Sequence, residues 1–397
     1  MNSNISFDVV ITGGTVYDGS GGTVYDGSGG PGVRADVGIV DGVVWAVSST
    51  PLEVGPATEV VDATGKWVTP GFVDVHTHYD AEVLVGPGLE ESVRHGVTTV
   101  LLGNCSLSTL YSTPVDIADL FSRVEALPRD HVLKAVDTHK TWTTPVEYIA
   151  ALERLPLGPN IAALVGHSDL RAHVMGLDRS TDRSQRPTRE EWRAMSDALE
   201  QALDAGLLGM STMTNPWDKL DGDRYRSRSL PSSYARWSEF RALHKILRRR
   251  GRLLQSIPNL NTKYDMLFFL ASATGVGRTP LKISLLAAAD AKRRRGFIAS
   301  SARSLVWSTD RARASSAGST CPPRSTCIPT GSTWWCSRSS VRAEQLCIYE
   351  KSWDATSCSR TRRIAAGSAP ISRRSSAHAS GIETSPTPRS PSAPTRR

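Results

Sequence analysis

Hydrophobic and polar residues follow two different spacings, and the first covers the N-terminal part of the chain. There, residues 8–18 and 33–68 alternate apolar and polar positions with Gly and Asp at the breaks, a pattern typical of strands that bury one face. Asp41 and Gly42 separate two such runs, which indicates a β-hairpin. We therefore expect residues 1–69 to form a small antiparallel β-domain.

This N-terminal part also contains two identical copies of an eight-residue segment. The sequence GTVYDGSG occupies residues 14–21 and again residues 22–29. Two copies are too few for a repeat fold. The content of Gly, Ser and Asp predicts a lengthened surface loop, which costs little because loop-closure entropy grows slowly with length.

From residue 71 onward, short apolar runs alternate with segments of helical spacing, which predicts βαβ units and a parallel sheet. The clearest helix begins after Thr188, has Glu191 in position for a capping box, and ends at Ala205 before Gly206. Six strand–helix pairs are visible, whereas a closed barrel of this kind needs eight. The predicted strands are 71–76, 97–103, 161–166, 207–211, 252–256 and 281–286, and the predicted helices are 86–95, 116–127, 145–154, 188–205, 236–250 and 264–274.

Both spacings are lost after Lys292. Residues 293–397 are dominated by Ser, Arg, Ala, Pro and Thr, with scattered apolar residues and no sustained period. Such a composition buries too little apolar surface to offset chain entropy, so we expect this basic, low-complexity tail to be largely disordered. Local packing is expected at most for Trp334–Trp335 and Ile348–Tyr349.

Charge and cysteine content change at the same point. The tail holds 18 Lys and Arg against 5 Asp and Glu, a net charge of +13, whereas residues 1–292 hold 29 against 34, a net charge of −5. Cys105 is the single cysteine before the tail. The five others fit no Cys-x-x-Cys zinc spacing, and they are Cys321, Cys327, Cys336, Cys347 and Cys358.

Two features bear on location. No stretch reaches 18 uninterrupted apolar residues, and the first residues combine neither a basic segment nor a long apolar one. We therefore expect a cytoplasmic protein without membrane insertion, in which disulfides are not expected.

The first candidate chemistry lies in TPGFVDVHTH, residues 69–78. The run reads as a short buried strand after a turn, and side chains two apart on a strand point the same way. His76 and His78 would then face the carboxyl end of a parallel strand, where sites of α/β barrels collect. This is a metal-ligand arrangement, although a pair of ordinary polar residues at a strand end is the alternative.

Two motifs resemble a known family. TPGFVDVHTH, preceded by VVDATGKWV (60–68), resembles the first barrel strand of the amidohydrolase superfamily, and GVTTVLLGNC (96–105) resembles its D-aminoacylase branch, the N-acyl-D-amino-acid deacylases. The resemblance covers about residues 7–292. It implies an α/β fold: an incomplete TIM-like (β/α)8 metal-dependent hydrolase barrel over residues 70–292, beside the small N-terminal β-domain and the disordered C-terminal tail.

The resemblance also implies a cofactor and a reaction. In that branch a cysteine after Gly-Asn ligates zinc, so the predicted ligands of a zinc ion are His76, His78 and Cys105. Taken alone, Cys105 is better read as a small buried hydrophobe, and the Gly-Asn-Cys context favours the ligand instead. Zinc would polarise a carbonyl and activate water. The implied reaction is hydrolysis of the acyl amide of a small-molecule N-acyl-D-amino acid. A cyclic-amide hydrolase of the same superfamily is the alternative, which the Gly-Asn-Cys context argues against.

The sequence departs from the family at three positions. Such deacylases carry histidines on the fifth and sixth barrel strands and an aspartate after the eighth as general base. Here the fifth-strand segment offers Gln255 or Ser256, the sixth offers Ser284 or Leu285, and the eighth would fall in the tail. No catalytic residue is therefore assigned, and a non-catalytic remnant is a further alternative.

Three residues are candidates for substrate binding. GHSDLR (166–171) follows a predicted strand and resembles a deacylase segment near the substrate. His167 would stand on the carboxyl-end face of the barrel, and Asp169 or Arg171 could orient a carboxylate. The alternative is a hydrogen-bonded loop that shapes the rim.

A different class of function would use the basic tail to bind nucleic acid. The tail contains no recognisable recognition module, and random basic composition explains its charge equally well. We therefore do not expect nucleic acid as a partner.

The tail leads to one prediction about the gene. Its abrupt start and its Arg, Ser, Pro and Thr content are what a GC-rich gene yields when it is read out of frame. We expect the coding DNA beyond codon 292 to encode a barrel-like continuation in one of the other two frames. Sequencing the gene and translating all three frames checks this, and the absence of such a continuation from both would contradict it.

Overall fold

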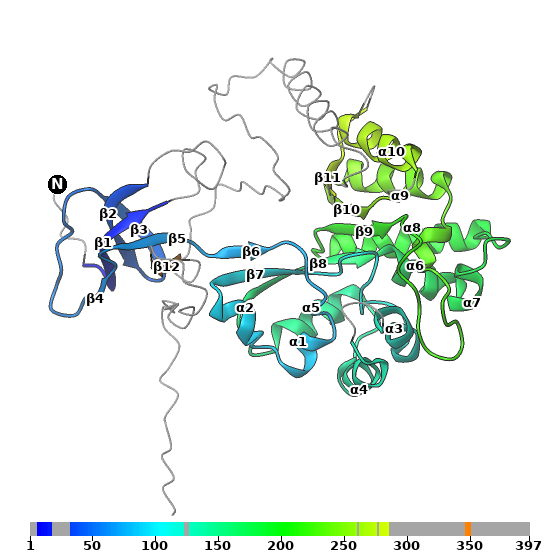
Figure 1. Ribbon diagram of the computed structural model, residues 1–397, viewed down its shortest axis with the longest axis horizontal. Coiled ribbons are helices and arrows are strands. Elements are labelled where there is room, and N and C mark those ends of the chain that lie inside the picture. The colour runs from blue at the N-terminus through cyan, green and yellow to red at the C-terminus, as the bar shows by residue number, and fades with distance from the viewer. Residues whose placement is uncertain are drawn as a thin grey trace, which may run out of the picture.

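The computed structural model describes residues 6–17, 32–122, 127–259, 262–275, 278–285 and 346–350. Two six-stranded sheets organise these residues, one near the N-terminus and a parallel one that follows it (Figure 1). The predicted surface loop of the tandem repeat falls mostly outside the described residues. The predicted disordered tail also lies outside them, apart from one strand.

The first sheet is mixed rather than purely antiparallel as predicted. β2 pairs antiparallel with both β1 and β3, whereas β4 and β5 run parallel to β1. The chain crosses back after β3, so β4 enters beside β1 in the same direction. The predicted hairpin is confirmed, because Asp41 and Gly42 join β2 to β3 with φ of 49° and 72°. The strands are β1 (Val9–Val16), β2 (Val33–Val40), β3 (Val43–Ser48), β4 (Glu59–Asp62) and β5 (Lys66–Pro70).

One strand comes from the predicted tail. β12 (Leu346–Glu350) pairs antiparallel with β5, which sets Ile348 opposite Val68 and Tyr349 opposite Trp67. The strand contains the Ile348–Tyr349 pair for which local packing was expected.

The second sheet is parallel throughout and has the order β11-β10-β9-β8-β7-β6. Each predicted strand is found within two residues of its predicted bounds, because buried parallel strands give short, clearly bounded apolar runs. The sheet curls as half of a barrel, so the predicted α/β fold with an incomplete barrel is confirmed. The strands are β6 (Phe72–Asp74), β7 (Val97–Leu102), β8 (Asn160–Gly166), β9 (Gly209–Met213), β10 (Leu253–Ile257) and β11 (Lys282–Leu285).

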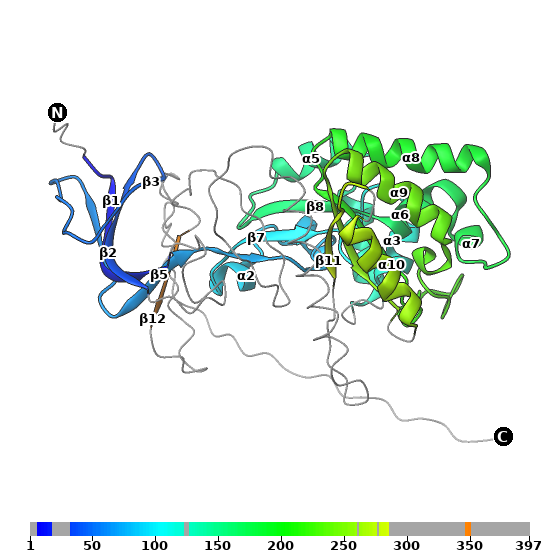
Figure 2. The same ribbon diagram turned by 90° about the horizontal axis from the view of Figure 1, so that it is seen from above.

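Helices accompany the parallel strands, with α8, α9 and α10 beside one another in both views (Figures 1 and 2). The predicted capping box is confirmed, since the Thr188 side chain accepts the Glu191 N–H at the start of α8. The sequence prediction missed α1, α4, α6 and α7. The helices are α1 (Glu82–Val85), α2 (Glu90–Arg94), α3 (Pro114–Phe121), α4 (Arg129–His139), α5 (Pro145–Glu153), α6 (His167–Met175), α7 (Leu177–Ser180), α8 (Arg189–Asp204), α9 (Trp237–Arg249) and α10 (Lys263–Thr274), with a 3₁₀ turn η3 (Pro231–Tyr234).

Within the described residues, none of these helices combines the length and the apolar character that a membrane crossing requires.

A buried histidine predicts how stability depends on pH. His244 of α9 is fully buried, with its ring 5.6 Å from that of Phe268 and 6.1 Å from that of Phe269, and burial lowers its pKa to about 3. The unfolded chain takes up this proton near pH 6.5, so stability present above that pH is lost as the pH falls. For this one group the loss reaches about 2 kcal/mol at about pH 5.

We expect His244→Phe to remove this part of the pH dependence. The free energy of unfolding is measured with urea at neutral pH and near pH 5. In His244→Phe its decrease between these two pH values should be smaller by about 2 kcal/mol than in the wild type. His131→Gln, at an exposed position of α4, is the control and should keep the wild-type difference. Equal pH dependence in His244→Phe and in the wild type would refute the assignment.

Candidate metal centre

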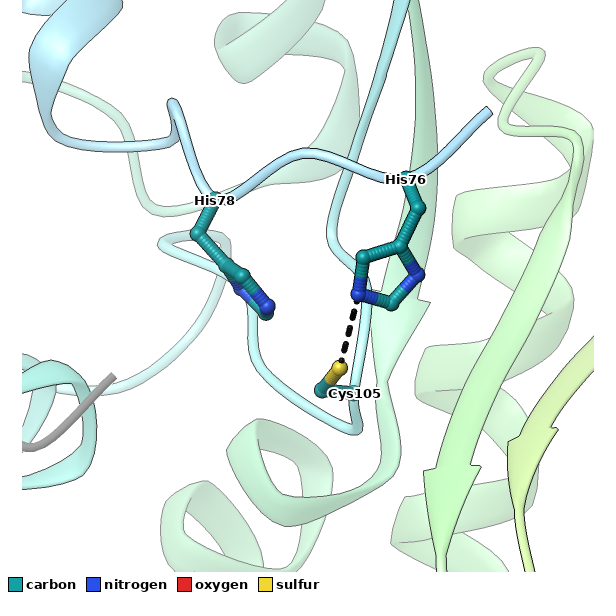
Figure 3. Close-up of side chains that lie close together, drawn as sticks. All are labelled: His76, His78 and Cys105. Atoms are coloured by element: carbon teal, nitrogen blue, oxygen red, sulfur yellow. Dashed lines mark hydrogen bonds between the residues drawn. The ribbon is translucent and has the colours of Figure 1, made fainter. Parts of the chain in front are cut away.

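The two candidate histidines lie in the loop that follows β6. The sequence prediction placed His76 on the strand, but β6 ends at Asp74, whose Oδ1 accepts the His76 N–H at 3.1 Å. The strand alternation used to pair the histidines therefore does not apply. They nevertheless converge, with ring centroids 5.2 Å apart and planes at 82° (Figure 3).

The third candidate ligand meets them from the neighbouring strand. Cys105 follows the end of β7, and its Sγ lies 3.2 Å from Nε2 of His76 (Figure 3). One ligand atom from each of His76, His78 and Cys105 can be chosen so that all three lie within 4.8 Å of one another. Among the described residues, this is the one such group of three or more histidine, cysteine or carboxylate side chains.

The protonation states suit a metal ligand set. Burial lowers the pKa of His76, and burial together with the neighbouring His76 lowers the pKa of His78 to about 4. Both imidazoles are therefore neutral at neutral pH, the form that donates a lone pair to a metal.

An unpartnered atom and the spacing also suit a metal. Nδ1 of His78 is buried and has no hydrogen-bond partner within the described part of the chain, a costly state unless the nitrogen is ligated. Ligand atoms around a tetrahedral zinc ion lie about 3.4 Å apart, given its usual bond lengths. The distance of 3.2 Å between Cys105 Sγ and His76 Nε2 is close to this value, and all three ligand atoms lie within 4.8 Å of one another, so the three side chains can approach one ion of that size.

The turn that carries Cys105 has an uncommon backbone. Gly103, Cys105 and Ser106 have φ of 77°, 55° and 70°. Positive φ at non-glycine residues is costly and is found where the surrounding structure enforces it, often at functional sites.

Side chains from three places hold this turn. The Gly103 N–H donates to Oδ1 of Asp80 at 3.0 Å, and burial raises the pKa of that carboxyl to about 7. The next contacts come from adjacent strands: Oε1 of Gln255 accepts the Cys105 N–H at 3.0 Å, and Oγ of Ser211 accepts the Ser106 N–H at 2.9 Å. Sequence reasoning missed Asp80 and Ser211, although Asp80 stands two residues after His78, the same spacing that drew attention to the histidine pair.

The fifth and sixth strands, β10 and β11, differ from the family pattern in the side chains at the positions of its two histidines. Of the two fifth-strand candidates, the Gln255 side chain contacts the Cys105 peptide. Gln255 pairs in register with Ser284 of β11, whereas Ser256 pairs with Leu285. Along the barrel face that carries Gln255, β10 and β11 therefore offer an amide and a hydroxyl where the family has imidazoles.

The three candidate substrate residues lie in α6, and all are buried. His167 bonds Thr212 Oγ1 at 2.9 Å and Glu239 Oε1 at 2.8 Å. Arg171 is paired with the same Glu239. These three residues are not in the metal-ligand group.

Asp169 serves the loop after Cys105. It accepts the Ser108 hydroxyl at 2.6 Å and backbone N–H groups of the same loop, those of Leu110, Tyr111 and Ser112. These contacts are the ones expected if the segment shapes a hydrogen-bonded loop at the rim. Substrate binding by His167, Asp169 or Arg171 stays a prediction.

Comparison with known proteins identifies the family. A model of the amidohydrolase family matches residues 59–231. The chain carries an amidohydrolase domain. An uncharacterised protein of Mycobacterium tuberculosis is 55% identical over 294 residues, 74% of this chain and 47% of that protein. An N-acyl-D-glutamate deacylase of Alcaligenes xylosoxydans is 36% identical over 246 residues, 62% of this chain and 42% of the enzyme. The chain thus spans less than half the length of these curated relatives.

Solved structures similar to this chain include members of the D-aminoacylase branch. An N-acyl-D-glutamate deacylase from Bordetella bronchiseptica, complexed with zinc and a phosphonate inhibitor, is 29% identical with a TM-score of 0.55, covering 79% of this chain and 57% of its own. A D-aminoacylase with a binuclear metal centre is 26% identical with a TM-score of 0.55, covering 78% and 56%. The resemblance stated from the sequence is confirmed.

The close packing of the Cys105 turn predicts the effect of one substitution. A Cβ at Gly103 would lie 2.1 Å from the carbonyl oxygen of Leu164 in β8, and φ is +77°. We expect Gly103→Ala to lower the free energy of unfolding by about 3 kcal/mol or more, since backbone strain and a backbone clash add.

Gly251→Ala is the matched control, because its φ is +63° and its Cβ would meet nothing within 4 Å. That substitution should cost only about 1 kcal/mol in the same urea titration. Equal losses for the two variants would contradict the close approach to Leu164.

Proposed function

We propose that the amidohydrolase domain binds one zinc ion through His76, His78 and Cys105 and hydrolyses the acyl amide of N-acyl-D-amino acids. The observation that carries this proposal is the convergence of three ligand atoms within 4.8 Å at the carboxyl ends of β6 and β7. Similarity to N-acyl-D-glutamate deacylases and to a D-aminoacylase supports the substrate class.

The chain's residues divide the work in this proposal. When bound, the ion would polarise the amide carbonyl of the substrate and make a water nucleophilic. The Cys105 turn holds the sulfur in position, and the low pKa values keep both imidazoles neutral. His78 and Cys105 are buried whereas His76 is partly exposed, so a small substrate reaches the centre from the His76 side.

A remnant that binds zinc without hydrolysis is the second candidate. It is supported by Gln255 and Ser284, which stand where the family has imidazoles. It is also supported by the lack, among the described residues, of a fourth histidine, cysteine or carboxylate in the group. Asp80, two residues after His78, is buried and accepts the Gly103 N–H.

We expect the purified full-length chain to bind about one zinc ion. His76→Gln and Cys105→Ser should each weaken zinc binding by about 100-fold or more, since removing a ligand costs at least as much as removing a residue that supports one. Competition with a chromogenic chelator measures this affinity. The control is His95→Gln, at the exposed C-cap of α2, which should bind like the wild type. Wild-type affinity in both ligand variants would refute the site.

The same preparation tests the reaction. Release of acetate from a series of N-acetyl-D-amino acids should stop on chelation and return with zinc. Turnover of hydantoin in place of the linear amides would favour the cyclic-amide alternative. Stoichiometric zinc with no turnover of either would favour the remnant.

A further inference from the structure

Gln255 lies on β10, next to the outermost described strand of the parallel sheet, and its side chain reaches the turn that carries Cys105. Its Cα is paired with that of Ser211 on β9 and with that of Ser284 on β11. The side chain is 2% exposed. Through Oε1 it reaches the Cys105 peptide, 150 residues away in sequence. A single side chain thus links the fifth strand of the sheet to the turn that presents the cysteine.

The hydrogen bond fixes the orientation of the amide. A backbone N–H can only donate, so the group facing Cys105 must be the carbonyl oxygen. The Nε2 end of Gln255 then carries two N–H groups beside the same peptide. Nε2 is buried and has no hydrogen-bond partner among the described residues.

Such a group favours a particular kind of ligand. A buried amide nitrogen without an acceptor carries an uncompensated desolvation cost, which a bound acceptor would remove. The neighbouring hydroxyl of Ser211 already accepts the Ser106 N–H. The amide nitrogen is a donor with no lone pair for a metal, so its partner is an oxygen atom such as a carbonyl or carboxylate oxygen.

We infer that the side-chain amide of Gln255 has two roles at this site. Its Oε1 positions Cys105, and its Nε2 donates a hydrogen bond to an oxygen of the acyl group of the ligand. The inference rests on the proposed function, because it places the ligand at the His76, His78 and Cys105 cluster. A donor at this point would also stabilise negative charge that develops on the carbonyl oxygen during attack.

Two substitutions separate the two ends. Gln255→Glu keeps an oxygen for the Cys105 N–H but loses the donor, whereas Gln255→Met has similar length and loses both. Gln201→Glu, at an exposed position of α8, is the charge-matched control. All are made in the full-length chain, and urea unfolding confirms that each variant folds.

Cobalt(II) in place of zinc gives a readout that does not depend on turnover. The sulfur-to-cobalt absorption band reports the Cys105 contact, and titration with acetate reports oxygen binding. We expect Gln255→Met to weaken the band and to raise the acetate dissociation constant by about three- to tenfold, the range of one hydrogen bond. Gln255→Glu should keep the band but bind acetate more weakly still, because a negative charge replaces the donor. The control should match the wild type in both readouts.

The outcomes distinguish this inference from the function it rests on. A wild-type chain that takes up no cobalt overturns the proposed metal centre. If cobalt is taken up and acetate binds equally to the wild type and to Gln255→Met, the donor role is overturned. An unchanged sulfur-to-cobalt band in Gln255→Met overturns the positioning role.

Discussion

The metal centre depends on three hydrogen bonds that peptide N–H groups donate to side-chain oxygens. Asp80, Gln255 and Ser211 accept the N–H groups of Gly103, Cys105 and Ser106, respectively. A turn with several positive φ angles cannot use the regular ladder of a helix or strand, so these acceptors take its place. Because they come from the loop after β6 and from β9 and β10, the turn forms only when the parallel strands are in register.

The surroundings of the turn are equally fixed. Asp169 accepts several N–H groups of the loop that follows, and the buried group of His167, Arg171 and Glu239 ties α6 to α9. Burial of these four polar side chains is tolerated because each has at least one partner among the described residues. A site built on such supports keeps its geometry before any ligand arrives, which is what tight and selective binding requires.

The sequence predicted the parallel strands closely because buried strands leave a strong apolar signal. It also selected the three residues of the cluster, although for an incomplete reason: the histidines converge through a loop and not through strand alternation. Helix α6 was missed because polar residues such as His167 and Asp169 lie on its buried side. The partners of these residues are distant in sequence. No local pattern reveals, for example, the ion pair between Arg171 and Glu239, which are 68 residues apart.

The open end of the parallel sheet has a consequence for the behaviour of the protein in solution. Within the described part of the chain, β11 is hydrogen-bonded to a single neighbour, β10. Its other side presents backbone N–H and C=O groups that any extended segment can adopt as a template. A closed barrel has no such side. Whether this edge of β11 can pair with an extended segment of another molecule therefore depends on what covers it, and not on the chemistry of the metal centre.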